Sequence, residues 1–251
     1  MADVGTFTPQ PAFVAGLRWH AVVAGRSSAR PVVVLHGWGA AGEAQLPAAR
    51  LLASSLRVLV PDLPGFGRSE QPSHVPTLPE LADALAGWMT AMGLAPAVVV
   101  GNSMGCQVLA HLAARHPDQV DAVVLQGPTI DAGARTVLRQ AARLAHGSRF
   151  ERPSLGWVQA RGVRQAGVGR LMTTLRHALD DRIEETVAEV ACPLLVVRGS
   201  RDPLVTQQWA ETVACRAPRG ELRVVPGPGH CMVYSAPLEL ARLVRGFLGR
   251  H

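Results

Sequence analysis

Residues 97–105, AVVVGNSMG, place a run of valines directly before a Gly-Asn-Ser-Met-Gly turn that opens a helical pattern. A strand followed at once by a helix leaves almost no room for a loop. The chain must therefore turn sharply at Ser103, with a positive φ angle that strains a non-glycine residue. Gly101 and Gly105 make the turn possible, because a Cβ atom on either side would collide across it. The turn raises the Ser103 hydroxyl above the end of a sheet and leaves the Met104 amide at a helix N-terminus.

A serine presented in this way is typical of the nucleophile elbow of acyl-transfer enzymes. The alternative interpretation is a glycine-rich connection in which the serine is incidental, because a five-residue motif also occurs by chance. The rest of the chain separates the two interpretations, since a serine nucleophile needs a base and the base needs an acid.

The composition is that of a globular α/β protein. The chain has 251 residues, of which 48% are hydrophobic and 18% charged, so it is long enough for one large domain with a buried sheet. No apolar stretch approaches the length that crosses a bilayer, and residues 1–11 lack the basic and apolar regions of a secretory signal. The four cysteines have no paired spacing, which favours reduced thiols in a cytoplasmic protein.

The formal charge of +6 comes from 25 basic residues that are all arginine. These arginines are scattered, and aromatic residues make up only 4% of the chain. No basic stripe alternates with stacking aromatics, as it would in many nucleic-acid-binding proteins. We therefore do not expect a nucleic acid as a partner.

Short runs rich in valine and leucine alternate with helical patterns, which is typical of a mostly parallel sheet flanked by helices. The expected strands cover residues 17–24, 31–35, 57–60, 97–100, 120–125, 194–198 and 222–225. The expected helices cover residues 43–54, 77–94, 104–115 and 206–215. Thr77 and Glu80 have the spacing of a capping box. We also expect Ser235 to cap a final helix that ends at Leu248.

Residues 128–190 interrupt this alternation, since they contain helical patterns but no strand. The expected organisation is a core of residues 1–127 and 191–251, with residues 128–190 forming a helical cap or lid over the carboxyl edge of the sheet. The alternative is two crossover helices and a long loop, but structureless loops of this length are rare. The residues we expect to line an acyl pocket beneath the cap are Leu171, Met172 and Leu175.

An acid and a histidine follow Ser103 at positions from which they can reach it. Asp202 comes directly after one late strand, and His230 comes directly after the last strand. Both lie in tight Gly/Pro loops, in the order Ser, Asp, His that an elbow on such a sheet requires. Taken singly, Asp202 could be a turn residue and His230 a structural histidine, but their joint placement favours a catalytic triad. Asp131 is the one serious rival for the acid.

The oxyanion that forms during acyl transfer needs two amide donors. Met104 supplies one at the helix N-terminus. The loop His36-Gly37-Trp38-Gly39 follows an early strand and supplies the second, for which Trp38 is the candidate. We expect His36 to brace this loop through hydrogen bonds rather than to act as a second base.

The chain resembles α/β-hydrolase-fold enzymes, and the resemblance spans nearly its whole length. The blocks that carry it occur in the family's order and are H-G-W-G (36–39), P-D-L-P-G-F-G-R-S (61–69), G-N-S-M-G (101–105), R-G-S-R-D-P-L-V (198–205) and G-P-G-H (227–230). The resemblance implies the α/β-hydrolase fold, with a helical cap inserted after the sixth strand. It also implies that Ser103 is the nucleophile, Asp202 the acid and His230 the base, with Trp38 and Met104 as the oxyanion amides.

Members of this family include carboxylesterases, lactonases, thioesterases, carbon–carbon bond hydrolases, cofactor-free haloperoxidases and hydroxynitrile lyases. The first two blocks are most similar to those of esterases, in particular pimeloyl-carrier methyl ester esterases. An elbow serine excludes the dehalogenases and epoxide hydrolases of this fold, which use an aspartate there. Cys106 departs from the family pattern, which usually has a glycine at this position, but it is small enough to preserve the packing of helix on strand.

We therefore expect a serine hydrolase that cleaves a small-molecule carboxylic ester, thioester or lactone through an acyl-enzyme, with no metal or organic cofactor. The alternatives are carbon–carbon bond hydrolysis or other chemistry at the same triad, and a non-catalytic ligand-binding protein. Arg135, Arg139 and Arg143 have the spacing of one stripe on a helix. This stripe is either a solvated face or a docking site for an acidic partner such as an acyl carrier protein.

Overall fold

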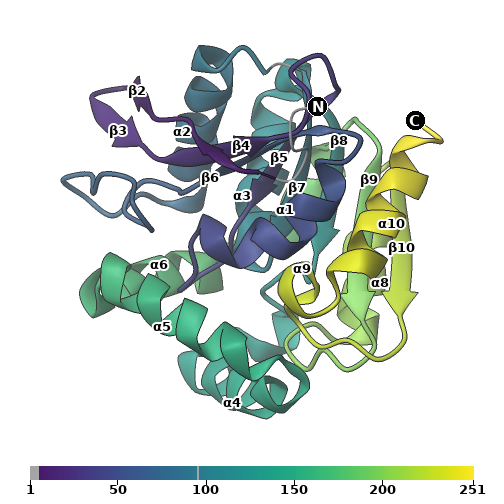
Figure 1. The fold of residues 1–251 in the computed structure, drawn as a ribbon. Coiled ribbons are helices and arrows are strands. Elements are labelled where there is room, and N and C mark those ends of the chain that lie inside the picture. Colours follow the sequence, from purple (N-terminus) through teal and green to yellow (C-terminus); the bar gives the residue numbers. More distant parts are fainter. Residues whose placement is uncertain (1–5, 95) are drawn as a thin grey trace.

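The valine run is strand β7 (Ala97–Asn102), and each of its six residues is buried. A strand with apolar side chains on both faces must be covered on both faces. In the computed structural model, which describes residues 6–94 and 96–251, β7 accordingly lies inside an eight-stranded sheet between two layers of helices (Figure 1).

The sheet is mostly parallel, as the sequence predicts. Its strand order is β1-β4-β6-β5-β7-β8-β9-β10, in which only the β1–β4 and β4–β6 pairs are antiparallel. A separate antiparallel pair joins β2 to β3. The strands besides β7 are β1 (Thr8–Pro9), β2 (Ala12–Val14), β3 (Leu17–Trp19), β4 (Ala21–Ala24), β5 (Pro31–Leu35), β6 (Arg57–Pro61), β8 (Val120–Gln126), β9 (Leu194–Gly199) and β10 (Gly220–Val225).

Alternate residues of the central strands point to opposite faces of the sheet and form two apolar cores. On one face, Val99 and Val123 belong to the core that includes α2, α3 and α8. On the other face, Val98 and Val124 belong to the core that includes α1, α9 and α10. These helices are α1 (Leu46–Leu52), α2 (Leu78–Ala91), α3 (Met104–Arg115), α8 (Gln207–Arg216), α9 (Met232–Ser235) and α10 (Pro237–Leu248).

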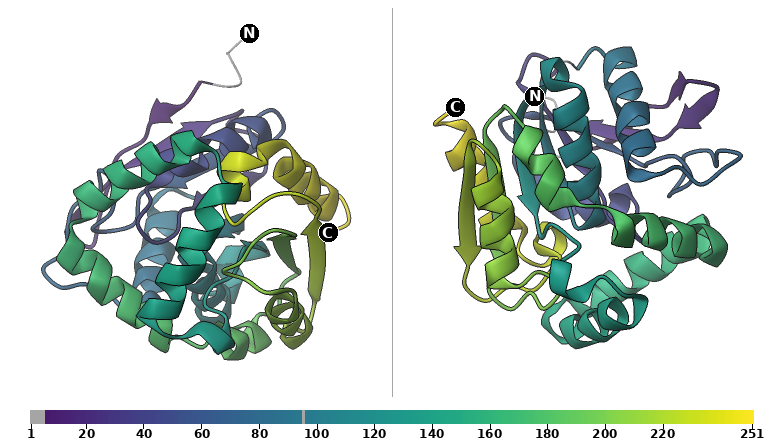
Figure 2. Two further views of the ribbon diagram at one scale, coloured as in Figure 1. Left: turned by 90° about the horizontal axis from the view of Figure 1, so that it is seen from below. Right: turned by 180° about the vertical axis from the view of Figure 1, so that it is seen from behind.

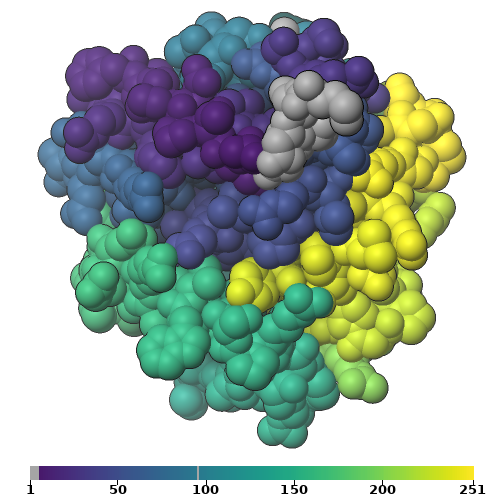
Figure 3. Space-filling view, in the orientation of Figure 1, coloured from purple at the N-terminus to yellow at the C-terminus, as the bar shows by residue number. Residues whose placement is uncertain are grey.

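A helical insertion, which we define as residues 128–190, separates β8 from β9. Its helices are α4 (Val137–Gly147), α5 (Pro153–Ala166), α6 (Val168–Asp180) and α7 (Ile183–Thr186). Helices α4, α5 and α6 lie across one end of the molecule (Figure 2), and Figure 3 shows them as the green part of the surface. β8 is the sixth strand of the main sheet in chain order. That the insertion acts as a cap stays a prediction.

The strand predicted over residues 17–24 is in fact two strands. β3 pairs with β2 outside the main sheet and stacks Trp19 on Trp88 of α2, with ring centroids 5.8 Å apart. β4 pairs with β1 and β6 within the main sheet. His20 lies between them and bonds to Ser69 and Asp62. Both pieces are apolar strands, so the pattern alone could not show that they have different partners.

Of the two helix caps that local motifs predict, one forms and the other does not. Thr77 and Glu80 form the predicted capping box of α2. The predicted cap at Ser235 is wrong, because α10 begins at Pro237 with no side-chain cap. Ser235 instead ends the short helix α9, and its hydroxyl oxygen lies 2.8 Å from the Cys231 carbonyl oxygen.

We predict that Gly105→Ala destabilises the fold by about 1–3 kcal/mol, which is typical of overpacking in a dense interior. A Cβ at this position would lie 2.6 Å from the carbonyl oxygen of His36, a backbone atom that cannot move aside on its own. Gly246→Ala in α10 is the control, since nothing lies within 4 Å of its added Cβ. That change should stabilise the helix by up to about 1 kcal/mol. Urea unfolding measures both effects, and equal midpoints would contradict the close approach at residue 105.

Candidate active site

The turn at residue 103 has the backbone that the sequence predicts. Ser103 has φ 57° and ψ −125°. A Cβ at Gly101 would lie 2.9 Å from the backbone of Gly105, and one at Gly37 would lie 2.8 Å from the Ser103 Cβ. The Ser103 amide donates to the carbonyl of Gln126 on β8 at 3.0 Å. Three glycines and a neighbouring strand therefore hold the strained residue in place.

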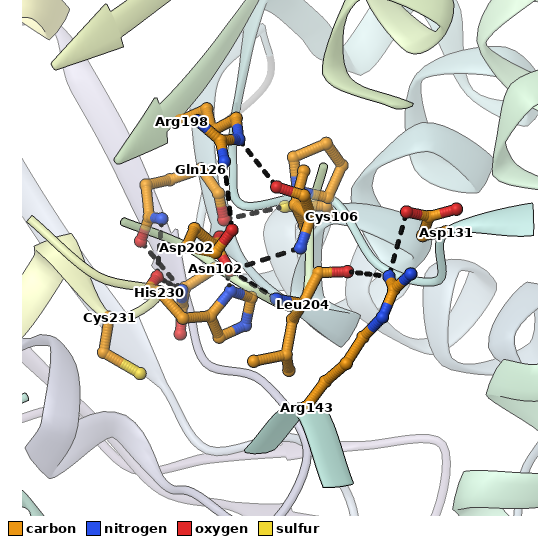
Figure 4. Close-up of polar contacts among 12 residues, drawn as sticks. Asn102, Cys106, Gln126, Asp131, Arg143, Arg198, Asp202, Leu204, His230 and Cys231 are labelled. Atoms are coloured by element: carbon orange, nitrogen blue, oxygen red, sulfur yellow. Dashed lines mark hydrogen bonds and ion pairs between the residues drawn. The ribbon is translucent and has the colours of Figure 1, made fainter. Parts of the chain in front are cut away.

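Asp202 and His230 meet beyond the ends of β9 and β10, which are parallel neighbours. The Nδ1 atom of His230 lies 2.8 Å from Oδ2 of Asp202, and both residues are buried (Figure 4). The other carboxylate oxygen, Oδ1, accepts the amides of Leu204 and Val205 at 2.8 and 3.2 Å. Because an ionised carboxylate only accepts hydrogen bonds, Nδ1 carries the proton and Nε2 of the neutral ring carries a lone pair.

The second ring nitrogen of His230 is distinguished by its position: among the buried side-chain atoms without a partner in the described residues, it alone belongs to a residue that lines the cavity. Nε2 forms no hydrogen bond with any residue in the described part of the chain. Ser103 and His230 line the same cavity. Unpaired buried polar atoms are rare in native proteins, and one that borders a cavity points to a ligand or a reacting group. The arrangement can therefore accept a proton at Nε2.

Two carboxylates make His230 a stronger base. Burial alone lowers the pKa of His230, but the charge and hydrogen bond of Asp202, together with the charge of Glu151, outweigh it. The pKa of His230 is consequently raised above its ordinary value of 6.5. A higher pKa increases the driving force for taking a proton from a weakly acidic hydroxyl.

Asp131, the rival candidate for the acid, makes other contacts. Its carboxylate accepts hydrogen bonds from Arg143 at 2.9 Å, from the Thr206 hydroxyl at 2.8 Å and from the Gly133 amide at 2.8 Å. Figure 4 shows Asp131 joined to Arg143, whereas the dashed line from His230 leads to Asp202. The geometry therefore favours Asp202 as the acid partner of His230.

Three residues that the sequence analysis did not single out position His230. Gln126 donates to the His230 carbonyl at 2.7 Å, and Asn102 donates to the Gln126 side chain at 2.8 Å. Gly127 has φ 63°, and a Cβ there would lie 3.0 Å from both Nδ1 and Cε1 of the imidazole. The only signal available in the sequence was that each of them lies within two residues of the end of an apolar strand pattern.

Arg198 supports the loop that carries Asp202. Its guanidinium donates to the Asp202 carbonyl at 3.0 Å and to the Val205 carbonyl at 2.6 Å. The side chain is buried, so these bonds are shielded from water. They fix the backbone on both sides of the turn in which the carboxylate lies.

Glu151 links the helical insertion to the loop that carries His230. One of its carboxylate oxygens accepts the Cys231 amide at 2.9 Å, and the other accepts the Ser235 hydroxyl. Gly229 permits this approach, since a Cβ there would lie 2.6 Å from a Glu151 carboxylate oxygen. Glu151 and Cys231 are 80 positions apart in the chain, so no local pattern could have identified their contact.

The loop after β5 lies against the turn at Ser103. His36 donates from Nδ1 to the Gly37 carbonyl at 3.0 Å, and its Nε2 accepts the Leu63 amide at 3.1 Å. Burial lowers the pKa of His36, which keeps the ring neutral as these bonds require. The predicted bracing role of His36 is therefore confirmed. Trp38 and Met104 line the cavity, and the use of their amides as oxyanion donors stays a prediction.

The cavity beneath the insertion has a volume of about 290 Å³ and a mainly apolar wall. Met172 and Leu175 of α6 lie along this wall. Leu171, the third residue expected there, instead packs in the protein core, and its carbonyl accepts the indole N–H of Trp38 at 2.8 Å. Leu171 is one turn before Leu175 and so lies on the same side of α6, but the core covers its side chain, so its position along the helix and not the side it faces separates it from the cavity.

The basic stripe expected from Arg135, Arg139 and Arg143 does not form. α4 begins at Val137, so Arg135 precedes the helix and forms an ion pair with Glu184. Arg139 donates to the Gly133 carbonyl, and Arg143 forms an ion pair with Asp131. These three arginines therefore bond to separate groups of the protein and offer no continuous stripe to an acidic partner.

Residues 6–94 and 96–251 contain neither a metal cluster nor a membrane span. No group of three or more histidine, cysteine or acidic side chains there is arranged to hold a metal ion. None of the helices in these ranges is both long enough and apolar enough to cross a bilayer. The four cysteines are unpaired, and Cys106 is buried with its Sγ 3.3 Å from the Gly101 carbonyl (Figure 4).

Comparison with known proteins finds relatives among hydrolases. The α/β hydrolase fold family matches residues 30–158. A putative carbamate hydrolase of Caulobacter sp. (strain K31) is 29% identical over 254 residues, which cover 92% of this chain and 95% of the relative. A pimeloyl-[acyl-carrier protein] methyl ester esterase of Chromobacterium violaceum is 30% identical over 238 residues, covering 84% and 91%. The crystal structure of a membrane phospholipase A has the same fold, with a TM-score of 0.84 at 22% identity, covering 98% of this chain and 87% of that one.

We predict that Glu151→Gln lowers the pKa of His230, because the substitution removes a negative charge that favours the protonated ring. Glutamine keeps an oxygen that can accept the Cys231 amide. NMR titration of the imidazole Cε1–H measures the pKa directly. Glu239→Gln, a change of an exposed glutamate outside this contact, is the control and should leave the titration in place. An unchanged pKa in folded Glu151→Gln protein would show that Glu151 does not act on the ring.

Proposed function

The chain belongs to the α/β-hydrolase-fold family, and we propose that it is a serine hydrolase that cleaves a small-molecule carboxylic ester, thioester or lactone. Its family and its relatives make it an enzyme of the hydrolase type. One observation carries the narrower proposal: His230 is bonded to Asp202 through Nδ1, while its buried Nε2 has no described partner in a cavity that Ser103 also lines. These are the hydrogen bonds expected of a neutral histidine that can accept the proton of a serine hydroxyl.

In the first half-reaction the Ser103 hydroxyl oxygen attacks the carbonyl carbon of the substrate, and Nε2 of His230 takes the hydroxyl proton. Asp202 stays ionised and stabilises the imidazolium. The carbonyl oxygen becomes an oxyanion, for which the amides of Trp38 and Met104 are the candidate donors. As the bond to the leaving oxygen or sulfur breaks, the imidazolium gives its proton to the leaving group, and the acyl group remains on Ser103.

In the second half-reaction water takes the place of the leaving group. His230 accepts a proton from the water as its oxygen attacks the acyl carbon. The collapse of this second intermediate breaks the bond to Ser103, and His230 returns the proton to the serine oxygen. The acid product leaves, and the site regains its starting protonation state without any cofactor.

The wall of the cavity favours an uncharged acyl group. Apart from His230, its polar lining consists of amides and hydroxyls such as Gln140, Gln159 and Thr129, and no arginine or acidic side chain among the described residues lines it. A carboxylate buried in such a wall would lack an ionic partner, which is energetically costly. This supports ester, thioester or lactone cleavage over the carbon–carbon bond hydrolysis of acidic substrates.

Two other interpretations have less support. An acyl carrier protein as partner is supported by the name of one relative. However, the arginines that suggested it bond to separate groups of the protein. A purely ligand-binding role gives no reason for a strained serine beside an unpaired histidine nitrogen.

We predict that a fluorophosphonate probe attaches to Ser103, because an activated serine attacks phosphorus as it attacks a carbonyl carbon. Mass spectrometry of the intact protein and of its peptides measures the adduct. Ser103→Ala should abolish both labelling and ester hydrolysis, whereas Ser154→Ala should label like the wild type. Folded wild-type protein that gains no adduct would rule out the proposed nucleophile.

We predict that Asp202→Asn lowers kcat for a short-chain aryl ester by about 10⁴-fold, because asparagine favours the wrong tautomer of His230. Asp131→Asn is the matched control, since it removes the rival carboxylate, and should reduce kcat by less than about tenfold. Both variants are first compared by thermal unfolding. A larger loss in Asp131→Asn than in Asp202→Asn would reverse the assignment of the acid.

A further inference from the structure

Although the arginines form no continuous stripe in the sequence, the net charge of the protein is concentrated in residues 137–180, which comprise α4, α5, α6 and the turns between them. From the first residue of α4 to the last residue of α6 (residues 137–180), the chain carries eight arginines and only two acidic residues, Glu151 and Asp180. The rest of the chain carries 17 arginines and 17 acidic residues, which cancel. The formal charge of +6 therefore belongs to the segment from α4 to α6, whose helices lie together at one end of the molecule (Figure 2).

Most of these eight arginines have no carboxylate partner. Among the described residues, Arg143 and Arg161 form the only ion pairs of this set, with Asp131 and Glu43. The arginines of the set that form none are Arg139, Arg149, Arg152, Arg164, Arg170 and Arg176. Their positive potential is not neutralised locally, so it extends into the solvent and attracts anions.

Large apolar side chains are exposed on the same three helices. The exposed fractions are 79% for Leu138 on α4, 82% for Trp157 on α5 and 70% for Val168 on α6. Trp157 is two residues from both Leu155 and Gln159, which line the cavity, so it projects from the opposite side of α5. Exposed apolar groups among arginines are typical of helices that lie in the interface of a lipid layer.

The cavity opens among these helices. Val137 and Leu144 of α4 line the cavity and are also 42% exposed. Apolar side chains therefore extend from the outer surface of the insertion into the cavity that Ser103 lines, and no arginine or acidic side chain of the described residues lines this cavity. An apolar acyl compound dissolves better in a lipid layer than in water, so a lipid layer would hold such a compound beside this opening.

We propose that the outer face of α4, α5 and α6 docks on a lipid surface that carries anionic headgroups. The arginines supply the electrostatic attraction, and Leu138 and Trp157 enter the boundary between headgroups and acyl chains. Val168 is one turn before Met172 and so lies on the side of α6 that turns toward the cavity. An acidic protein surface could also pair with the arginines, but it would need a separate pocket for each apolar side chain. A lipid interface accepts these side chains at any position. The proposal concerns binding and does not depend on the proposed hydrolysis.

The first test is the partition of the full-length protein onto vesicles of phosphatidylcholine with about 30 mol% phosphatidylglycerol. We expect partition onto these vesicles, weak partition onto phosphatidylcholine alone, and release in about 0.5 M salt because salt screens the attraction. Trp157 reports its own insertion through a blue shift of the emission, since Trp19, Trp88 and Trp209 are already buried and Trp38 is part of the cavity wall, with its indole N–H bonded to the Leu171 carbonyl. Trp157→Phe should abolish most of the shift, while Phe13→Ala, at an exposed residue outside these helices, should retain it.

The second test compares two sets of charge changes of equal size. Arg139→Gln, Arg164→Gln and Arg176→Gln together, one from each helix, should weaken partition about 100-fold. The control combines Arg26→Gln, Arg216→Gln and Arg242→Gln, which are exposed elsewhere, and should change partition only a few-fold. Equal losses from the two sets would overturn the proposal, as would absence of partition at low salt. Tight binding of a purified acidic acyl carrier protein without any binding to vesicles would assign the face to a protein partner instead.

Discussion

The left-handed backbone of Ser103 constrains the parts of the structure around it. A residue with φ 57° persists only where its surroundings prevent relaxation. Here a fully buried strand precedes it, a helix follows it, and its amide is bonded to Gln126 of the next strand. Glycines at positions 37, 101 and 105 let three backbone segments approach one another more closely than any side chain would allow. The neighbouring strands β5 and β8 then bring the Trp38 loop and Gly127 to the same end of the sheet.

The candidate site combines extensive hydrogen bonding with one unpaired atom. Asp202 is held through its carboxylate and its carbonyl, and the His230 backbone is held by Gln126. Only Nε2 of the imidazole is left without a described partner, and His230 lines the cavity together with Ser103. The helical insertion contributes Glu151 to the histidine loop, so the segment that walls the cavity also raises the basicity of the ring.

The sequence was most informative where function depends on the ends of strands. Ser103, Asp202 and His230 each follow an apolar run directly, and the carboxyl ends of parallel strands meet at one edge, so their proximity could be predicted. It was less informative for the insertion. Leu171 packs in the core and Arg135 precedes its helix, because the residue at which a helix begins and the groups that cover each of its turns depend on packing against distant segments.

By itself, the sequence determined the class of the fold, the strained turn at Ser103 and the concentration of charge in residues 137–180. These features follow from local periodicity, from glycine and from residue counts. Only the tertiary structure decided that His230 bonds to Asp202 rather than to Asp131, and that Glu151 reaches a loop 80 residues away. Such contacts join distant segments, and they depend on how whole elements pack, which no local pattern specifies.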